Sequence, residues 1–248
     1  MNEIKGVADL LISSKLAIAL TGSGISTGSG IPTFRGKDGL WTKYDPEKFT
    51  IDYFLKNPKD FWKTARELFI PLLDAKPAKS HYVLAELEKL GIIKAVITQN
   101  IDGLHQKAGS NIVLELHGNG RKLKCHLCGE EYEIEPYIND IINDNIPRCK
   151  KCNSYLKTSA VLFGEMLPRD VYLQSIYYSY SSDVMLVIGT SLSVEPAASL
   201  PFQAKERGAK IITINKDRTP IDELSDFVLK GNSDEILENI LNEVKKML

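Results

Sequence analysis

Short and almost uniformly apolar runs recur along the chain, and segments with a helical spacing of apolar residues lie between many of them. The run at 184–188 is apolar at every position, which is typical of a parallel strand covered on both faces. The runs predict strands at 16–20, 95–98, 113–116, 160–163, 184–188, 210–214 and 227–229. The helical patterns cover 78–90, 169–180, 196–207 and 234–247. This alternation predicts an open α/β sheet that binds its ligand at the carboxyl ends of the strands.

Two segments interrupt the alternation of strands and helices. Residues 29–77 contain no convincing strand and are rich in proline, so we expect loops and short helices there. Residues 121–157 contain all the cysteines of the chain and look like a small inserted module. The sequence therefore predicts one large α/β unit with two insertions.

The overall composition is that of a globular protein. Hydrophobic residues make up 43% and charged residues 25% of the 248 residues, which argues against a disordered or collagen-like chain. The formal net charge of -1 gives no general attraction to nucleic acid or to an anionic membrane, and we expect a monomer. Residues 1–20 lack the unbroken apolar core of a signal peptide, and no other run reaches membrane-spanning length. We therefore expect a cytoplasmic protein whose cysteines stay reduced.

The cysteines form two close pairs, Cys125 with Cys128 and Cys149 with Cys152. Two C-x2-C pairs at this separation match a structural zinc ribbon, in which each tight turn directs two thiolates to one ion. The module is too short to fold on a core of its own, and zinc can contribute on the order of 10 kcal/mol to such a unit. His126 is a rival ligand, and chance spacing of free cysteines is the alternative. The module has seven basic and six acidic residues, a balance that argues against a nucleic-acid footprint.

A glycine-rich segment, TGSGISTG at 21–28, follows the first predicted strand. Such a turn can direct backbone N–H groups toward a phosphate, although an ordinary tight turn can have the same residues. The dinucleotide fingerprint of dehydrogenases has its third glycine where Thr27 stands, and no acidic residue ends a second strand about 20 residues further on. The segment therefore argues against an ordinary hydride-transferring dehydrogenase.

The same segment also fits the G-x-S-x-G nucleophile elbow of serine hydrolases. Ser26, Asp102 and His117 follow one another in the order of the α/β-hydrolase triad. This elbow would follow the first strand instead of a later one, and Pro32 leaves little room for the helix behind it. A serine hydrolase is therefore kept as an alternative function.

Small or polar residues follow several of the predicted strands further along the chain. They are residues 98–102, His117 with Gly118, residues 163–165, residues 189–191 and Asn215. Because the carboxyl ends of parallel strands meet at one edge of a sheet, these residues indicate one shared site. His117 is a candidate general base there, with a purely structural histidine as the alternative.

Together these motifs look like those of a sirtuin. The segments GSGIS at 22–26, GIPTFR at 30–35, TQNID at 98–102, HG at 117–118, the paired cysteines, FGE at 163–165 and GTS at 189–191 come in that family's order. The resemblance implies an NAD-dependent protein-lysine deacetylase with NAD bound between a large Rossmann-like domain and a small zinc domain. It divides the chain into the Rossmann-like domain (1–35, 78–120 and 158–248), a cofactor loop with a helical insert (36–77) and the zinc module (121–157).

The resemblance also implies roles for individual residues. His117 would be the general base, and Asn100, Ile101 and Asp102 would form the nicotinamide pocket at the reaction centre. The rest of the NAD site would comprise Gly22, Ser23, Gly24, Thr27, Phe34, Arg35, Gln99, Gly189, Thr190, Ser191, Asn215 and Ser233. An acyl-lysine peptide would be bound by Val161, Phe163, Gly164, Glu165 and Val194. The products would be nicotinamide, free lysine and O-acetyl-ADP-ribose, and transfer of ADP-ribose to proteins, as in some relatives, is a further alternative.

The chain departs from the sirtuin pattern in several places, and the absence of one residue pair bears on the choice of acyl group. Lys157-Thr158 replaces a frequent Arg-Pro pair, with no consequence that the sequence reveals. Members that remove acidic acyl groups carry a Tyr-x-x-Arg pair in the helical insert, where this chain has Trp62 and Ala65, with Arg66 one place late. We therefore expect a preference for acetyl and other uncharged acyl groups.

Overall fold

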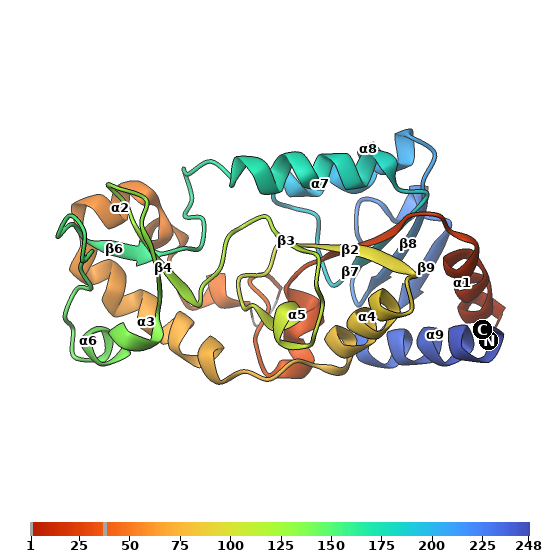
Figure 1. The fold of residues 1–248 in the computed structure, drawn as a ribbon, viewed down its shortest axis with the longest axis horizontal. Helices are drawn as coiled ribbons and strands as arrows, with labels where there is room; N and C mark the ends of the chain where they lie inside the picture. Colours follow the sequence, from red (N-terminus) through yellow and green to blue (C-terminus); the bar gives the residue numbers. More distant parts are fainter. Residues whose placement is uncertain (1, 37–38) are drawn as a thin grey trace.

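The computed structural model describes residues 2–36 and 39–248, so Lys37 and Asp38 of the predicted cofactor loop lie outside the described residues. Its larger part is a six-stranded parallel sheet in the order β3-β2-β1-β7-β8-β9 (Figure 1). The strands are β1 (Ala17–Thr21), β2 (Ile93–Thr98), β3 (Val113–Glu115), β7 (Val184–Ile188), β8 (Lys210–Asn215) and β9 (Phe227–Lys230). Because β1 lies between β2 and β7, the chain reverses its direction of winding at β1, where doubly wound sheets bind their ligands.

Successive residues of each central strand point into two different apolar layers. In β1, Ala17 and Ala19 belong to one buried cluster, whereas Ile18 and Leu20 belong to another. The first cluster includes residues of α1 (Asn2–Ser13), α4 (Lys79–Lys89) and α9 (Ser233–Met247). The second includes residues of α7 (Arg169–Ser181) and α8 (Leu200–Glu206), which lie on the opposite side of the sheet (Figure 1). This double coverage explains why the strands are apolar at nearly every position.

The smaller part of the molecule is built from the two insertions together. Strand β4 (Lys122–Cys125) pairs antiparallel with β5 (Glu131–Glu133) and with β6 (Leu156–Thr158). This sheet shares one apolar core with α2 (Ile51–Lys56), α3 (Pro58–Asp74) and α6 (Ile138–Ile142). Phe61 from α3 and Leu123 from β4 are both fully buried in it. The cysteine-bearing module therefore obtains from the helical insert the core that it is too short to form alone.

The prediction of a strand at 160–163 is wrong. The N–H of Val161 donates to the carbonyl oxygen of His117 (2.8 Å), whereas the N–H of Phe163 donates to that of Phe49 (3.0 Å). Phe163 forms an isolated parallel bridge with Thr50. The segment therefore bonds to both parts of the molecule in turn, and no continuous ladder with one neighbour forms. The strand of this region is β6, which ends just before it.

Two long helices differ from the prediction. Helix α1 was not predicted, although Val7 and Leu11 are buried against the sheet. Helix α3 has 17 residues, longer than the short helices expected from the proline content. Pro58 occupies its first turn, where a missing N–H costs nothing, and Pro71 lies in its last turn. Among residues 2–36 and 39–248, no helix has the length and apolar composition needed to cross a membrane.

Candidate active site

The carboxyl ends of β1, β2, β7 and β8 border a cavity of about 920 Å³ that also contacts the smaller part of the molecule. His117 and all the predicted NAD- and peptide-binding residues except Asp102 line this cavity. The apolar residues of its wall that were not predicted include Trp41, Phe49, Leu68 and Phe69, all from the proline-rich insertion. Their apolar character indicated burial, but not which surface they would face.

The glycine-rich segment is a 3-10 helix, Ser23–Ser29, that packs tightly against the end of β7. The N–H of Gly24 donates to the carbonyl oxygen of Gly189 at 2.8 Å. A Cβ atom on Gly24 would lie 2.7 Å from the Cα of Gly189, so this approach requires glycine. Beside it, the Gln99 amide donates to the Thr190 hydroxyl (2.9 Å). This end of the cavity is therefore lined by glycines and small hydroxyls, a surface that fits the diphosphate of NAD.

His117 follows β3 and is half-buried in the cavity wall. Its Nδ1 lies 2.9 Å from the carbonyl oxygen of Gln99, and because a carbonyl can only accept, Nδ1 carries the proton. Nε2 is then the basic nitrogen of the neutral ring. Burial lowers the pKa of His117 below its ordinary value of 6.5; the bond to Gln99 opposes this shift, and the positive charge of Arg35 adds to it. The imidazole is therefore a neutral base near pH 7.

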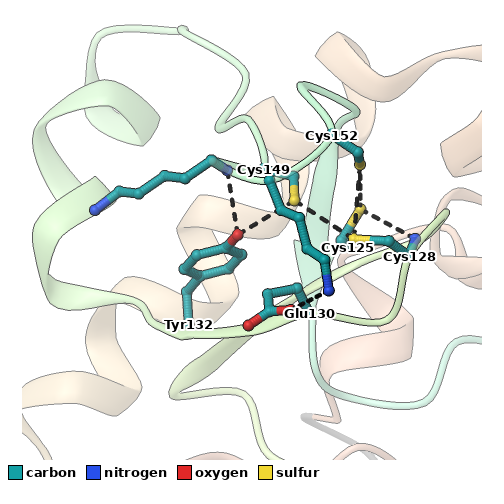
Figure 2. A network of polar contacts seen from close by, with 8 residues as sticks. Cys125, Cys128, Glu130, Tyr132, Cys149 and Cys152 are labelled. Atoms are coloured by element: carbon teal, nitrogen blue, oxygen red, sulfur yellow. Dashed lines mark hydrogen bonds and ion pairs between the residues drawn. The ribbon is translucent and has the colours of Figure 1, made fainter.

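The cysteines predicted to bind metal form one cluster (Figure 2): Cys125, Cys128, Cys149 and Cys152. Their sulfur atoms all lie within 4.8 Å of one another, with 3.5 Å between Cys125 and Cys152. A tetrahedral zinc site with Zn–S bonds of about 2.3 Å has S···S distances of about 3.8 Å. His126 is not a member of the cluster, and its Nε2 lies 2.7 Å from the Ser154 hydroxyl instead. The cluster therefore fits a zinc ribbon with a closed shell of four thiolates.

Tyr132 supports this cluster from the second strand of the ribbon, and no sequence motif marked it. Its hydroxyl lies 3.2 Å from the Cys149 sulfur and accepts a hydrogen bond from the N–H of Lys150 at 3.2 Å (Figure 2). The bond to the sulfur raises the pKa of Tyr132 to about 12, with a further contribution from burial. The hydroxyl therefore remains a donor that can hold a Cys149 thiolate in place.

The Sir2 family model matches residues 22–196. The chain belongs to the Sir2 family. It is 48% identical over 248 residues to NAD-dependent protein deacylase 2 of Archaeoglobus fulgidus, an alignment that covers 99% of this chain and 98% of that protein. It is 47% identical over 242 residues to an NAD-dependent protein deacetylase of Saccharolobus solfataricus, covering 98% and 97%. The resemblance inferred from the motifs is thereby confirmed.

Solved Sir2 structures have the same fold. A Sir2 complex with a p53 peptide and NAD+ has a TM-score of 0.91 at 41% identity and covers 98% of this chain and 99% of that one. A Sir2 protein bound to an acetylated peptide has a TM-score of 0.89 at 40% identity, covering 97% and 98%. The predicted Rossmann-like sheet with a small zinc ribbon is therefore confirmed.

In this Sir2 chain Asp102 lies behind the cavity wall, with a side chain that is almost entirely buried. One carboxylate oxygen accepts from the Ser26 hydroxyl (2.7 Å), and the other accepts from the N–H of Leu104 in α5 (Leu104–Lys107) at 2.9 Å. Asn100, which does line the cavity, donates to Ser26 Oγ (3.1 Å) and to the carbonyl oxygen of Gly22 (3.2 Å). Asp102 therefore orients Asn100 through Ser26 instead of facing a ligand itself.

This geometry rejects the serine hydrolase alternative. Ser26 is fully buried and donates directly to Asp102, whereas His117 donates to Gln99. In a triad the serine would donate to the histidine, and the histidine to the aspartate. The three residues follow the hydrolase order in the sequence, but the fold does not assemble them.

Two buried histidines extend the network: His81, which no motif marked, and His105, which follows the strand-end residues 98–102. His81 of α4 places Nε2 3.5 Å from Ser26 Oγ, and His105 of α5 places Nε2 2.9 Å from the Thr21 hydroxyl. The two rings lie 4.8 Å apart between centroids. Burial lowers the pKa of both, so they stay neutral near pH 7. His81 lies in the first turn of α4, away from any strand end, so no pattern linked it to the site.

The residues compared with the Tyr-x-x-Arg pair do not face the cavity. Trp62 is buried and donates its indole N–H to a carbonyl of β6, and Arg66 forms an ion pair with Asp144 at 2.7 Å. The residues of α3 that line the cavity are Leu68 and Phe69, further along the helix. The wall that α3 contributes to the cavity is therefore apolar, which favours an uncharged acyl group.

Proposed function

We propose that this Sir2 protein is an NAD-dependent protein-lysine deacetylase. It converts an acetylated lysine, NAD and water into free lysine, nicotinamide and O-acetyl-ADP-ribose. The observation that carries the proposal is His117, a neutral base in a cavity that has a glycine-rich polar end and an apolar wall. The names of its relatives and the Sir2 complexes with NAD+ and with acetylated peptide support the same activity.

The glycine-rich end of the cavity would hold NAD. Residues 22–24 and 190–191 offer backbone and hydroxyl groups to the diphosphate, and Asn100 and Ile101 would contact the nicotinamide, with Asp102 fixing Asn100 from behind. Further contacts would come from Thr27, Phe34, Arg35, Gln99, Gly189, Asn215 and Ser233. When bound, NAD supplies the ribose carbon from which nicotinamide leaves and to which the acyl oxygen is transferred.

His117 would remove a proton from a ribose hydroxyl through Nε2. The bond from Nδ1 to Gln99 fixes the tautomer that leaves Nε2 free to accept this proton. Phe34, which also lines the cavity, would shield the reacting centre from water. The apolar wall around Val161, Phe163 and Val194 would enclose the acyl-lysine side chain.

A direct test is mass spectrometry of an acetyl-lysine peptide incubated with the protein, with and without NAD. We expect loss of the acetyl group only when NAD is present, with nicotinamide and O-acetyl-ADP-ribose formed in equal amounts. A succinylated peptide of the same sequence is the matched control and should react much more slowly, because Leu68 and Phe69 offer no positive charge. Deacetylation without NAD would overturn the proposal, and a peptide that gains the mass of ADP-ribose would indicate a transferase instead.

The pH dependence of kcat/KM follows from the state of His117. The protonated ring is inactive as a base, so kcat/KM should fall as the pH is lowered through the pKa of His117. Because burial lowers that pKa, this acid limb should lie below pH 6.5. A profile measured with an acetylated peptide from pH 5 to 8 checks this prediction. An acid limb centred above pH 7 would contradict it.

A further inference from the structure

Lys157 is a buried lysine to which the reaction described above gives no role. It lies in β6 of the ribbon sheet, and its side chain is only 5% exposed. Its ammonium group donates to the carbonyl oxygens of Thr158 (3.0 Å) and Ala160 (3.1 Å), and it lies 2.9 Å from a carboxylate oxygen of Glu165. These three acceptors match the three N–H groups of the ammonium. Lysine is seldom buried without such partners, so the contact is specific.

Glu165 connects this lysine to the backbone of the loop at 162–165. The carboxylate oxygen that faces Lys157 also accepts a hydrogen bond from the N–H of Leu162 at 2.8 Å. The N–H of Glu165 in turn donates to the carbonyl oxygen of Leu162 at 3.0 Å. Gly164, inside the turn, has a φ of +89°, a conformation that favours glycine. One carboxylate therefore both closes the turn and binds Lys157.

The loop that Lys157 holds is part of the cavity wall. All the residues of 160–165 line the cavity, whereas Lys157 is not among the described residues that do so. The loop also bonds to His117 through the N–H of Val161 and pairs with Phe49 through Phe163. These bind it to the parallel sheet and to the helical insert. Lys157 attaches it to the ribbon sheet, together with a bond from the N–H of Ala160 to the Thr158 hydroxyl (3.1 Å).

We propose that Lys157 is a positioning residue for acyl-peptide binding, which links the zinc ribbon to the loop at 160–165 through Glu165. The inference rests on the proposed function, since Glu165 and its neighbours are the peptide-binding residues of that proposal. Lys157 acts on the substrate only through the loop. Its effect should therefore appear in the binding of the peptide and not in that of NAD.

The test is steady-state kinetics of Lys157→Met, a neutral residue of similar length. We expect the KM for an acetylated peptide to rise about ten-fold, since a small displacement of a binding loop weakens contacts strongly. The KM for NAD and the value of kcat should stay within about two-fold, because the NAD-binding residues keep their contacts. Lys157→Arg keeps the charge and several N–H donors, and should restore most of the peptide KM.

Two controls separate positioning from a general loss of structure. Lys122 lies in the same sheet, but its side chain is exposed and its ammonium makes a long contact of 3.8 Å with Glu133. The Lys122→Met variant should therefore behave as the parent. Zinc content should be equal in all variants. If Lys157 acts through Glu165, the double variant Lys157→Met with Glu165→Gln should raise the peptide KM no further than the worse single variant.

The outcomes distinguish this inference from the proposed function. A parent protein that does not deacetylate contradicts the proposed function, and with it this inference. An active parent with an unchanged peptide KM in Lys157→Met contradicts the inference alone. If Lys157→Met does not fold, Lys157→Gln replaces it in the same measurements. Loss of zinc or of ADP-ribose binding in both variants would show that Lys157 serves stability and not peptide binding.

Discussion

Replacing His117 with alanine is expected to lower kcat by about 10²–10⁴-fold, the usual contribution of a positioned general base. The structure gives the imidazole a fixed tautomer, with Nδ1 bound to the Gln99 carbonyl and Nε2 available as the base. Burial lowers the pKa of His117 below 6.5, so most of the enzyme population has the base in its active form at pH 7. The measurement is kcat for deacetylation of a peptide at saturating NAD.

Binding should survive this substitution, because His117 provides one face of a large cavity and the glycine-rich end does not depend on it. ADP-ribose affinity within about two-fold of the parent would show that kcat fell for a chemical reason. His126→Ala is the matched control, since His126 is an exposed histidine of the ribbon that is bonded to Ser154. A His117→Ala variant that keeps more than a tenth of the parent kcat would contradict the assignment of the base.

The parallel sheet could be predicted because its central strands are covered on both faces, which forces them to be apolar at nearly every position. The ribbon strands could not be predicted in the same way. Glu131–Glu133 and Leu156–Thr158 are three-residue strands with polar side chains, so they form no apolar run. The extended segment at 160–163 has such a run, but its bonds go to both parts of the molecule. A short run of apolar residues therefore indicates burial more reliably than it indicates strand pairing.

The cavity residues were predicted because sheet geometry brings the carboxyl ends of parallel strands together. The network behind them was missed for the opposite reason. His81 and His105 come from two helices and meet Ser26 and Thr21 through tertiary packing, for which one sequence contains no spacing rule. The apolar wall from α3, Leu68 and Phe69, was likewise not predicted, because the face that a helix presents to a cavity depends on how the helix docks. The monomeric state and the cytoplasmic location stay predictions from composition.

Removing zinc from the ribbon is expected to abolish deacetylation while most of the parallel sheet remains folded. The apolar core of the smaller part of the molecule contains Cys125 and Cys149. It also contains Phe49 and Leu162, which line the cavity. Zinc contributes on the order of 10 kcal/mol to units of this kind, so without it this core should loosen and the peptide side of the cavity should lose its shape. The buried clusters of the parallel sheet contain neither cysteine and should keep their packing.

The experiment compares the parent, the chelator-treated protein and Cys149→Ser by zinc analysis, circular dichroism, ADP-ribose binding and deacetylation. Metal-free protein should lose turnover and retain most of its helical signal, and added zinc should restore activity to the chelated parent but not to Cys149→Ser. Cadmium should restore it as well, because four thiolates close the shell and leave no position for a substrate on the metal. Full activity without metal would contradict the structural role of zinc. If the cadmium-loaded protein is folded but inactive while the zinc-loaded protein is active, the metal would have a role in the chemistry instead. The closed thiolate cluster and the separate position of His117 favour a structural role for zinc. In that case the ribbon shapes the peptide side of the cavity, and the parallel sheet holds NAD.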